Sequence, residues 1–224
     1  MTNKKSILKF ENISKSFGNQ LILNDVSIEI IEGETIAIVG PSGIGKTTFL
    51  NLAGTIDQPD SGNIFFNQEN ITSLSEKERS IFRNKHIGFI FQLHYLLPQC
   101  TVLENILIPT IINSSNSEKK EAEKRAIELL YRFGMSENRN KLPGQLSGGE
   151  CQRTAFIRAL INQPELILAD EPTGSLDEEN AIHLISELIK LNKELNTTLL
   201  LVTHSTKLAE QMDKILYLKN HKIN

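Results

Sequence analysis

Apolar and polar residues alternate along the start of the chain, in residues 7–17 (ILKFENISKSF) and 22–30 (ILNDVSIEI). Alternation with a period of two is typical of antiparallel strands that bury one face. Residues 35–40 (TIAIVG), 166–170 (LILAD) and 198–204 (TLLLVTH) are instead continuous apolar runs, as expected for strands that are covered on both faces. The pattern therefore predicts an N-terminal antiparallel sheet beside a sheet of buried strands.

Three stretches predict helices: residues 47–56, much of residues 101–133, and the amphipathic segment at residues 178–195. Strands that alternate with helices indicate a largely parallel sheet with right-handed crossovers. The stretch between Gln92 and Ser147 contains helical patterns and no strand. We therefore expect it to stand off the sheet as an inserted subdomain.

Two shorter strands are predicted at residues 63–67 (NIFFN) and 86–92 (HIGFIFQ). The C-terminal sequence DKILYLKNHKI predicts a hairpin with its turn near residues 220–221. The whole chain of 224 residues is then one domain. Its expected division is into a core, residues 1–92 and 152–224, and a helical subdomain, about residues 93–151.

The composition of the chain argues against several classes of protein. The chain is 39% apolar and 23% charged, with a net charge of −3 and no Lys/Arg-rich run, so no nucleic-acid partner is expected. Cys100 and Cys151 are too few for a disulfide framework, and each is expected to be a small packed residue. The sequence MTNKKSILKF has no apolar signal segment, and no apolar run approaches the roughly 20 residues that span a bilayer. We expect a cytosolic chain that another protein would have to hold at a membrane.

The sequence GPSGIGKTT matches GxxxxGK[ST] and lies between a buried strand and a helix, which is the context of a phosphate-binding P-loop. Glycines let the backbone N–H groups of such a loop surround a phosphate. Lys46 would place its charge on the β- and γ-phosphates, and Thr47 would offer its hydroxyl to Mg²⁺. The predicted nucleotide-binding residues of this loop are Gly40, Pro41, Ser42, Gly43, Ile44, Gly45, Lys46, Thr47 and Thr48.

The sequence LILADEP ends a buried strand with two adjacent acids, Asp170 and Glu171. P-loop enzymes hold Mg²⁺ with an acid in this position, so Asp170 is a candidate metal residue. Neighbouring carboxylates repel each other unless a cation or a proton transfer uses them. Glu171 is therefore the candidate general base for an attacking water. Ordinary solvated loop acids are the alternative.

These motifs occur in a characteristic order: GPSGIGKTT, a strand-terminal Gln92, LSGGE, LILADEP, SLD and a strand-terminal His204. Together, over essentially the whole chain, they resemble the nucleotide-binding subunit of an ABC transporter. LSGGE carries the most weight, because many NTPase classes share the P-loop. The resemblance implies an α/β P-loop NTPase core with a mixed, largely parallel sheet, an N-terminal antiparallel β subdomain and an inserted helical subdomain. It also implies ATP hydrolysis with Mg²⁺.

LSGGE begins a predicted helix, and the N–H groups of a helix start attract anions. ABC ATPases form head-to-tail dimers in which each ATP lies between one P-loop and the partner's LSGGE. The resemblance thus implies that Ser147, Gly148 and Gly149 meet the γ-phosphate of ATP on a second copy. A capping box, in which Ser147 caps the helix and Glu150 bonds back, is the alternative. Capping alone does not call for two glycines, since both lower helix propensity.

The resemblance assigns further roles. Gln92 corresponds to the residue that touches Mg²⁺ and the attacking water, and His204 to the switch histidine at the γ-phosphate. Asp177 belongs to the loop that crosses the dimer interface. Phe17 matches the aromatic residue that stacks on adenine, with an ordinary core or surface phenylalanine as the alternative.

Two residues depart from the family pattern. Ile44 replaces a small polar residue of the P-loop, and Cys151 stands where glutamine usually follows LSGGE. The P-loop acts through backbone N–H groups, and Cys151 leaves the contacting Ser and Gly residues in place. Neither departure puts ATP hydrolysis in doubt.

Residues 83–109 (RNKHIGFIFQLHYLLPQCTVLENILIP) resemble the group of lipoprotein-releasing, macrolide-export (MacB-type) and FtsE-type cell-division ATPases, and His94 followed by LLP is closest to the lipoprotein-releasing (LolD-type) members. The implied partners are a second copy of the chain and integral membrane permease subunits that dock on the helical subdomain, holding the chain at the cytoplasmic face of the inner membrane. An export ATPase and a regulatory ATPase that signals through a membrane partner are the alternatives. The apolar residues expected to form the docking groove, or else to pack the helical insert, are Leu93, Tyr95, Leu96 and Leu97.

Overall fold

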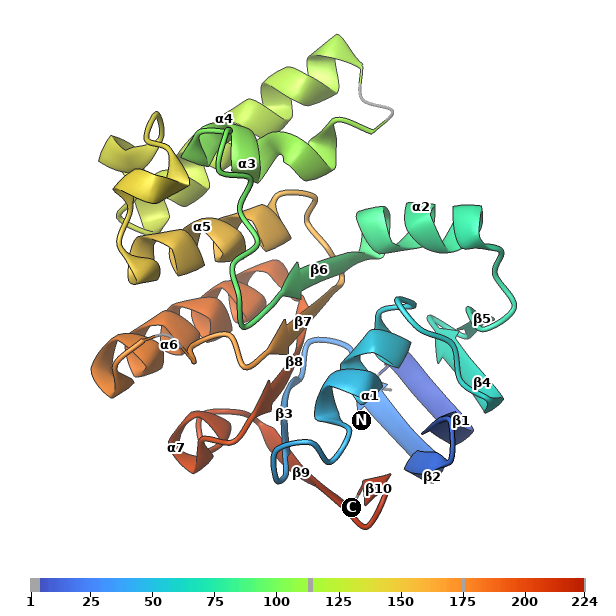
Figure 1. Cartoon of the computed structure of the whole chain (residues 1–224). Coiled ribbons are helices and arrows are strands. Elements are labelled where there is room, and N and C mark those ends of the chain that lie inside the picture. Colours follow the sequence, from blue (N-terminus) through green and yellow to red (C-terminus); the bar gives the residue numbers. More distant parts are fainter. Residues whose placement is uncertain (1–4, 113–114, 175, 224) are drawn as a thin grey trace.

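The computed structural model describes residues 5–112, 115–174 and 176–223, so Ser175 of the predicted SLD motif lies outside the described residues. Its strands are β1 (Ser6–Phe17), β2 (Gln20–Ile31), β3 (Thr35–Val39), β4 (Ser61–Phe66), β5 (Glu69–Asn70), β6 (Ile87–Ile90), β7 (Leu166–Asp170), β8 (Thr198–Thr203), β9 (Lys214–Lys219) and β10 (Lys222–Ile223). Its helices are α1 (Lys46–Ala53), α2 (Glu76–His86), α3 (Val102–Leu107), α4 (Asn116–Arg132), α5 (Gly148–Leu160), α6 (Glu178–Leu195) and α7 (Thr206–Ala209), with 3₁₀ turns η1 (Ile108–Thr110), η2 (Ser136–Asn138) and η3 (Pro143–Gln145) (Figure 1).

The N-terminal segments form an antiparallel sheet with the strand order β2-β1-β4-β5. The alternation in β1 works as predicted, since Leu8, Phe10 and Ile13 are buried while Lys9 and Asn12 face solvent. Register shifts along the β1–β2 ladder bend the pair, and bulges of this kind increase the local twist.

The second sheet has the order β10-β9-β3-β8-β7-β6 and is parallel except for the terminal β9–β10 hairpin. Its central strands are buried on both faces because successive side chains enter different hydrophobic clusters. In β8, Leu200 and Val202 belong to the cluster shared with α1 and the antiparallel sheet. Leu199 and Leu201 belong to the cluster shared with α5 and α6.

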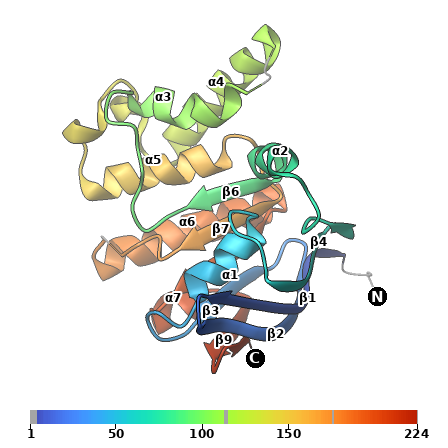
Figure 2. The same cartoon turned by 45° about the vertical axis from the view of Figure 1, so that its right-hand side comes forward.

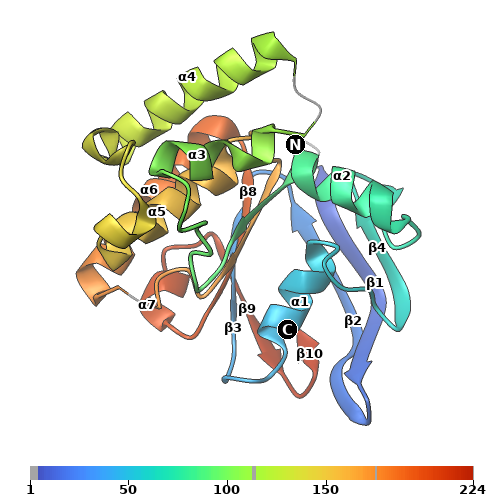
Figure 3. The same ribbon diagram turned by 45° about the horizontal axis from the view of Figure 1, so that its top comes forward.

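The second sheet therefore lies between two layers, with α1 and the antiparallel sheet on one face and α5 and α6 on the other. Figure 3 shows α1 between the two sheets and α6 and α7 on the opposite side of the second sheet. In Figure 2, α3, α4 and α5 lie beyond β6, at the end of the molecule away from the antiparallel sheet. The combination of an α/β core, an antiparallel N-terminal sheet and a set of inserted helices is the predicted fold class.

The predicted helical stretch 101–133 is divided in the structure into α3, η1 and α4. Pro109 lies in η1, and a proline has no N–H with which to continue an α-helix. The expected subdomain limit between residues 151 and 152 falls inside α5, which runs without interruption from Gly148 to Leu160.

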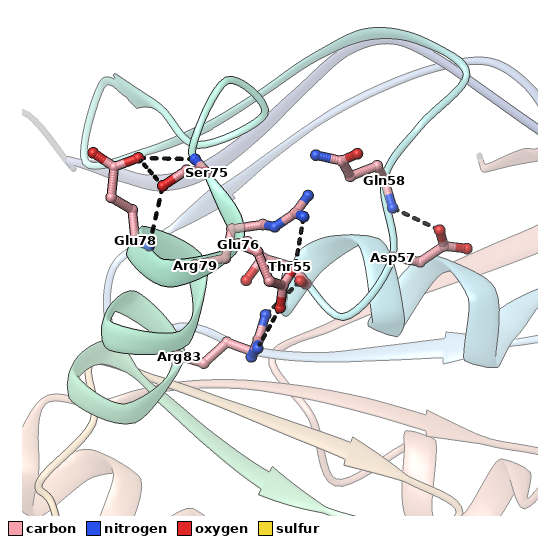
Figure 4. A network of polar contacts seen from close by, with 8 residues as sticks. All are labelled: Thr55, Asp57, Gln58, Ser75, Glu76, Glu78, Arg79 and Arg83. Atoms are coloured by element: carbon pink, nitrogen blue, oxygen red, sulfur yellow. Dashed lines mark hydrogen bonds and ion pairs between the residues drawn. The ribbon is translucent and has the colours of Figure 1, made fainter. Parts of the chain in front are cut away.

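Two helices, α2 and α7, have no counterpart in the sequence-based prediction. Residues 76–86 of α2 include no buried side chain, so the helix has no apolar stripe to detect. Its start is nevertheless encoded locally, because Ser75 and Glu78 form a capping box. Figure 4 shows this cap together with Glu76, which pairs with Arg79 and Arg83.

Helix α2 also shortens the strand that was predicted at residues 86–92. His86 is the last residue of the helix, and β6 comprises Ile87–Ile90. Gln92 consequently lies beyond the strand end rather than on it. Within the described residues, no helix is long and apolar enough to cross a membrane.

Gly88 permits the close approach of β6 to α5. A Cβ at this position would overlap the carbonyl oxygen of Ala159 and would lie 3.0 Å from Cγ of Pro164. We expect Gly88→Ala to lower the free energy of unfolding by about 2 kcal/mol, because the helix must shift away from the sheet. Gly144→Ala is the matched control, since no described heavy atom lies within 4 Å of its Cβ position. Equal urea-unfolding midpoints for the two variants would contradict this packing argument.

Candidate active site

The functional motifs meet because three neighbouring strands are parallel. Strands β3, β8 and β7 lie side by side, so their carboxyl ends share one edge of the sheet. The P-loop follows β3, Asp170 ends β7 and His204 follows β8. Ligand sites of open α/β sheets lie at this edge.

A cavity of about 550 Å³ opens at this edge of the sheet. It collects residues that the sequence placed in separate motifs, including Phe17 from the antiparallel sheet and Gln92 from beyond β6. The lining residues are Phe17, Ile22, Ser42, Gly43, Gly45, Lys46, Thr47, Thr48, Gln92, Asp170, Glu171 and His204.

The P-loop glycines have a steric role that only glycine can fill. Gly45, the N-cap of α1, has a φ of 111°, and a Cβ there would lie 2.5 Å from Cγ2 of Ile22. A Cβ on Gly40 would lie 2.7 Å from the carbonyl oxygen of Leu218. Gly43 adopts a φ of 75° without any such neighbour among the described residues. The loop is therefore pressed against β2 and β9 at its two ends, with its middle open to the cavity.

Lys46 is buried at the start of α1 and folds back over its own loop. Its ammonium donates to the carbonyl oxygens of Gly40 at 2.9 Å and Pro41 at 3.1 Å. A carboxylate oxygen of Glu171 lies 3.9 Å away. The positive charge thus sits in the cavity wall and can reach an anion above the loop.

Asp170 has the features of a cation ligand. Its Oδ1 atom is buried without a hydrogen-bond partner in the described part of the chain. Burial raises the pKa of Asp170 and the charge of Glu171 adds to that effect, whereas the Thr47 hydroxyl and Lys46 oppose it.

This geometry fits Mg²⁺ that arrives with a nucleotide. Among the described residues, no group of three or more His, Cys, Asp or Glu side chains could hold a metal ion by itself. Mg²⁺ is commonly bound by one or two protein oxygens, several waters and substrate phosphates. The unpartnered oxygen of Asp170, beside the Thr47 hydroxyl, offers such a ligand set.

Glu171 is held in a conformation that few non-glycine residues adopt. Its φ is 45°, in the left-handed region, and its N–H donates to the carbonyl oxygen of Val202 at 2.9 Å. Local strain of this kind costs on the order of 1 kcal/mol and is concentrated at functional sites. The carboxylate is 2.7 Å from Nδ1 of His204, whose side chain is 75% exposed.

The start of α5, within LSGGE, is not among the residues that line the cavity. Ser147 caps the helix, since its hydroxyl accepts from the N–H of Glu150 at 3.3 Å and the Glu150 carboxylate accepts from the N–H of Ser147 at 2.7 Å. Asn138 donates to the other oxygen of Glu150 at 2.7 Å. The N–H of Ser147 and the amide of Asn138 lower the pKa of Glu150.

The two glycines of LSGGE are not required by this chain's own packing. No described heavy atom lies within 4 Å of a Cβ built on Gly148, and the nearest to Gly149 is Cδ2 of Leu176 at 3.5 Å, an ordinary contact. The capping box is real, but it leaves these glycines unexplained. The space beside Gly148 is open in the described part of the chain.

Asp177 also lies outside the cavity lining. It caps α6, accepting from the N–H of Asn180 at 2.9 Å and from the Asn180 amide at 2.6 Å. These bonds lower the pKa of Asp177. The residue thus has a helix-capping role within the single chain.

The two departures from the family pattern are accommodated by packing. Ile44 packs against the cluster between the two sheets, and its N–H donates to Pro41. Cys151 is buried with Leu96 and Ala155, and burial raises the pKa of its thiol. Leu96 therefore packs the helical insert, and its prediction as a docking residue is wrong. Leu93, Tyr95 and Leu97 are exposed, as the docking hypothesis requires.

Two contributors to the site were missed from the sequence. Ile22 lines the cavity, but in the sequence it has only the pattern of a half-buried strand residue. Arg158 of α5 donates to the carbonyl oxygens of His94 at 2.7 Å and Tyr95 at 2.8 Å, and so holds the segment that follows Gln92. No local sequence signal marks an arginine that binds backbone carbonyls of a distant loop.

The chain is similar to known proteins in both sequence and structure. The profile described as ABC transporter matches residues 23–174. The chain is 47% identical over 212 residues to the lipoprotein-releasing system ATP-binding protein LolD of Bacteroides fragilis, covering 95% of this chain and 97% of that protein. It is 40% identical over 220 residues to LolD of Coxiella burnetii, covering 96% and 94%.

Among solved structures, the chain is similar to the dimeric bacterial ABC transporter cassette MJ0796, with a TM-score of 0.87, 38% identity and 97% coverage of both chains. A post-hydrolysis dimer of the same cassette bound to ADP and phosphate matches with a TM-score of 0.87 and 37% identity, again over 97% of both chains. Motifs, cavity and similarities agree, and the chain belongs to the ABC transporter family, as one of its ATP-binding subunits that hydrolyse ATP for transport.

Proposed function

We propose that this chain powers the release of lipoproteins from the inner membrane, as the ATPase of a complex with integral membrane subunits. The observation that carries the proposal is its 47% identity to a lipoprotein-releasing ATPase along 95% of this chain. The similarity spans the segment after Gln92, which in our proposal faces the membrane partner. Export of a compound and signalling through a membrane partner are the competing functions.

We place ATP hydrolysis in the cavity that the P-loop lines. Phe17 would stack on adenine, while the backbone N–H groups of the P-loop and Lys46 would bind the phosphates. Thr47, Gln92 and Asp170 would hold Mg²⁺, which would neutralise phosphate charge and polarise the phosphoryl oxygens. The distance of 2.7 Å between Glu171 and His204 supports their pairing at the catalytic edge.

In this mechanism Glu171 is the general base. Its carboxylate would accept a proton from the attacking water, and His204 would orient that carboxylate and contact the γ-phosphate. Gln92 would position the water. The strained backbone of Glu171 supports this role, since strain persists where the surroundings fix a side chain for a task.

The complete site would require two chains. We propose a head-to-tail dimer in which Ser147, Gly148 and Gly149 bind the γ-phosphate of the partner's ATP, with the loop of Asp177 at the interface. The open space beside Gly148 supports this arrangement, because a phosphate could approach the helix N-terminus closely. Close approach would explain why glycines occupy positions that favour other residues in a helix.

The membrane subunits would dock on the helical subdomain, about residues 93–151, and hold the chain at the cytoplasmic face of the inner membrane. A second cavity of about 460 Å³ lies between α2, β6 and η1, lined in part by Ile56, Phe91, Ile112 and Arg158. Exposed Leu93 and Tyr95 lie two and four residues after Phe91. Because Arg158 binds the backbone beside Tyr95, the LSGGE helix would move with this surface.

The membrane partner tests the function directly. A tagged chain purified from detergent-solubilised membranes should retain subunits of a lipoprotein-releasing complex, identified by mass spectrometry. Tyr95→Asp should reduce that recovery about tenfold or more, because a charge would enter an apolar interface. Tyr217→Asp, a comparably exposed tyrosine on β9 outside the helical subdomain, is the control and should leave recovery unchanged. Recovery of export or cell-division subunits instead would replace lipoprotein release by that function.

The role of Glu171 is tested by removing its basicity while keeping its shape. We expect Glu171→Gln to lower the hydrolysis rate about a hundredfold or more and to leave ATP binding in place. The variant should then accumulate an ATP-bound dimer, visible by size-exclusion chromatography with light scattering. The wild-type chain should remain mostly monomeric without ATP. Normal turnover by Glu171→Gln would remove this residue as the base.

The trans arrangement is tested by mixing two inactive chains. Lys46→Ala should abolish ATP binding, and Ser147→Arg should block ATP-dependent dimerisation while the monomer still binds ATP. A mixed dimer would contain one intact P-loop opposite one intact LSGGE, so the mixture should regain measurable ATPase activity. Loss of ATP binding by the Ser147→Arg monomer in isothermal titration would place LSGGE at its own chain's nucleotide, against the proposal.

A further inference from the structure

Lys15 carries a buried charge beside the nucleotide cavity without being among the residues that line it. The residue is 8% exposed and lies on β1, two positions before Phe17. Its ammonium donates to Oδ1 of Asp57 at 2.8 Å and to the carbonyl oxygen of Gln58 at 2.7 Å. A carboxylate oxygen of Asp60 lies 3.8 Å away. The charge is therefore fixed from several directions.

The same ammonium lies over the ring of Phe17, 5.1 Å from its centroid. A cation at this distance is attracted by the electrons of the ring face. Phe17 is 53% exposed and lines the nucleotide cavity, whereas Lys15 is buried. One face of the ring is thus covered by a fixed charge, which leaves the other face for a ligand.

The carboxylates that hold Lys15 belong to the segment that follows α1. The N–H groups of Ile56 and Asp57 both donate to the carbonyl oxygen of Asn51 in that helix. Asp60 in turn accepts from the N–H of Ser16 on β1 at 2.7 Å. Helix α1 begins at Lys46 of the P-loop. It therefore connects the P-loop to Asp57, which holds Lys15 against the ring of Phe17.

Stability alone does not account for this arrangement. Replacing a buried ion pair by well-packed apolar residues is often neutral or stabilising, because both charges must be desolvated. An apolar residue at position 15 would have avoided that cost. A network of charged hydrogen bonds does fix the position of the Lys15 ammonium, since each bond sets a direction as well as a distance.

We propose that Lys15 is a positioning residue for adenine recognition. Its ammonium holds the ring of Phe17 against the nucleotide cavity, at a distance from the P-loop that α1 and Asp57 set. The proposal rests on the assignment of Phe17 as the adenine platform. It predicts that the lysine contributes to the affinity for the base and leaves the affinity for the phosphates unchanged.

The test is a double-mutant cycle on the full chain with two probes, ADP and inorganic tripolyphosphate, measured by isothermal titration with Mg²⁺. Lys15→Met removes the charge and keeps the length of the side chain. It should weaken ADP binding about three- to tenfold, the range expected for loss of a partly buried cation–π contact. Tripolyphosphate binding should not change, and Lys15→Arg should retain most of the ADP affinity.

Phe17→Ala should weaken ADP binding, and adding Lys15→Met to it should have no further effect, because the lysine acts through the ring. Lys9→Met is the matched control, an exposed β1 lysine paired with Glu11, and it should alter neither ligand. The role of Lys15 would be overturned if Lys15→Met left the ADP affinity unchanged, or if it weakened ADP and tripolyphosphate binding equally. It would also be overturned if the losses of ADP affinity in Lys15→Met and Phe17→Ala added up in the double variant. Unchanged ADP affinity in Phe17→Ala would instead remove the adenine platform itself, and the proposal with it.

Discussion

The parallel pairing of β3, β8 and β7 is the constraint on which the site depends. Parallel strands place their carboxyl ends together, so the P-loop, Asp170 and His204 meet although the sequence separates them widely. The cost of closing such long loops is met by the burial of these strands on both faces. Any substitution that shifts one of the three strands would displace a phosphate, metal or base residue together with the core.

The same constraint gathers only some of the predicted nucleotide-binding residues in one cavity. The ends of the strands supply Lys46, the carboxylates of Asp170 and Glu171, and the P-loop backbone to this cavity. The start of α5 belongs to the inserted helices beyond β6 and does not line that cavity (Figure 1). The helix nevertheless begins with two glycines, and among the described residues no heavy atom lies within 4 Å of a Cβ built on Gly148. In the head-to-tail dimer that we propose, the helix start of one copy would face the cavity of the other, as a symmetric pair of chains allows.

The core and the motifs could be predicted because their signals are local. Buried strands such as β7 are continuous apolar runs, and the P-loop has a fixed spacing. Helix α2 could not be found by periodicity, since none of its side chains is fully buried and only one of its apolar side chains, Phe82, packs against the core, on Phe66. Its cap and Arg83, which donates to the carbonyl oxygen of Thr55, also hold it. Leu96 and Arg158 were beyond reach for a different reason. Tertiary contacts decide whether an apolar residue such as Leu96 faces α5 or solvent. They also decide which backbone carbonyls an arginine such as Arg158 binds.

Two lysines, Lys15 and Lys46, are equally buried near the cavity, and their partners distinguish them. Lys46 binds neutral carbonyl oxygens at close range and lies 3.9 Å from its nearest carboxylate, so much of its charge remains available to an anion. Lys15 is 2.8 Å from Asp57 and has a second carboxylate nearby, so its charge is already compensated. A compensated cation gains little from a phosphate and is suited to a fixed structural task. The surroundings of the two ammonium groups, more than their burial, therefore suit Lys46 to an anionic ligand and Lys15 to the positioning role that we propose for it.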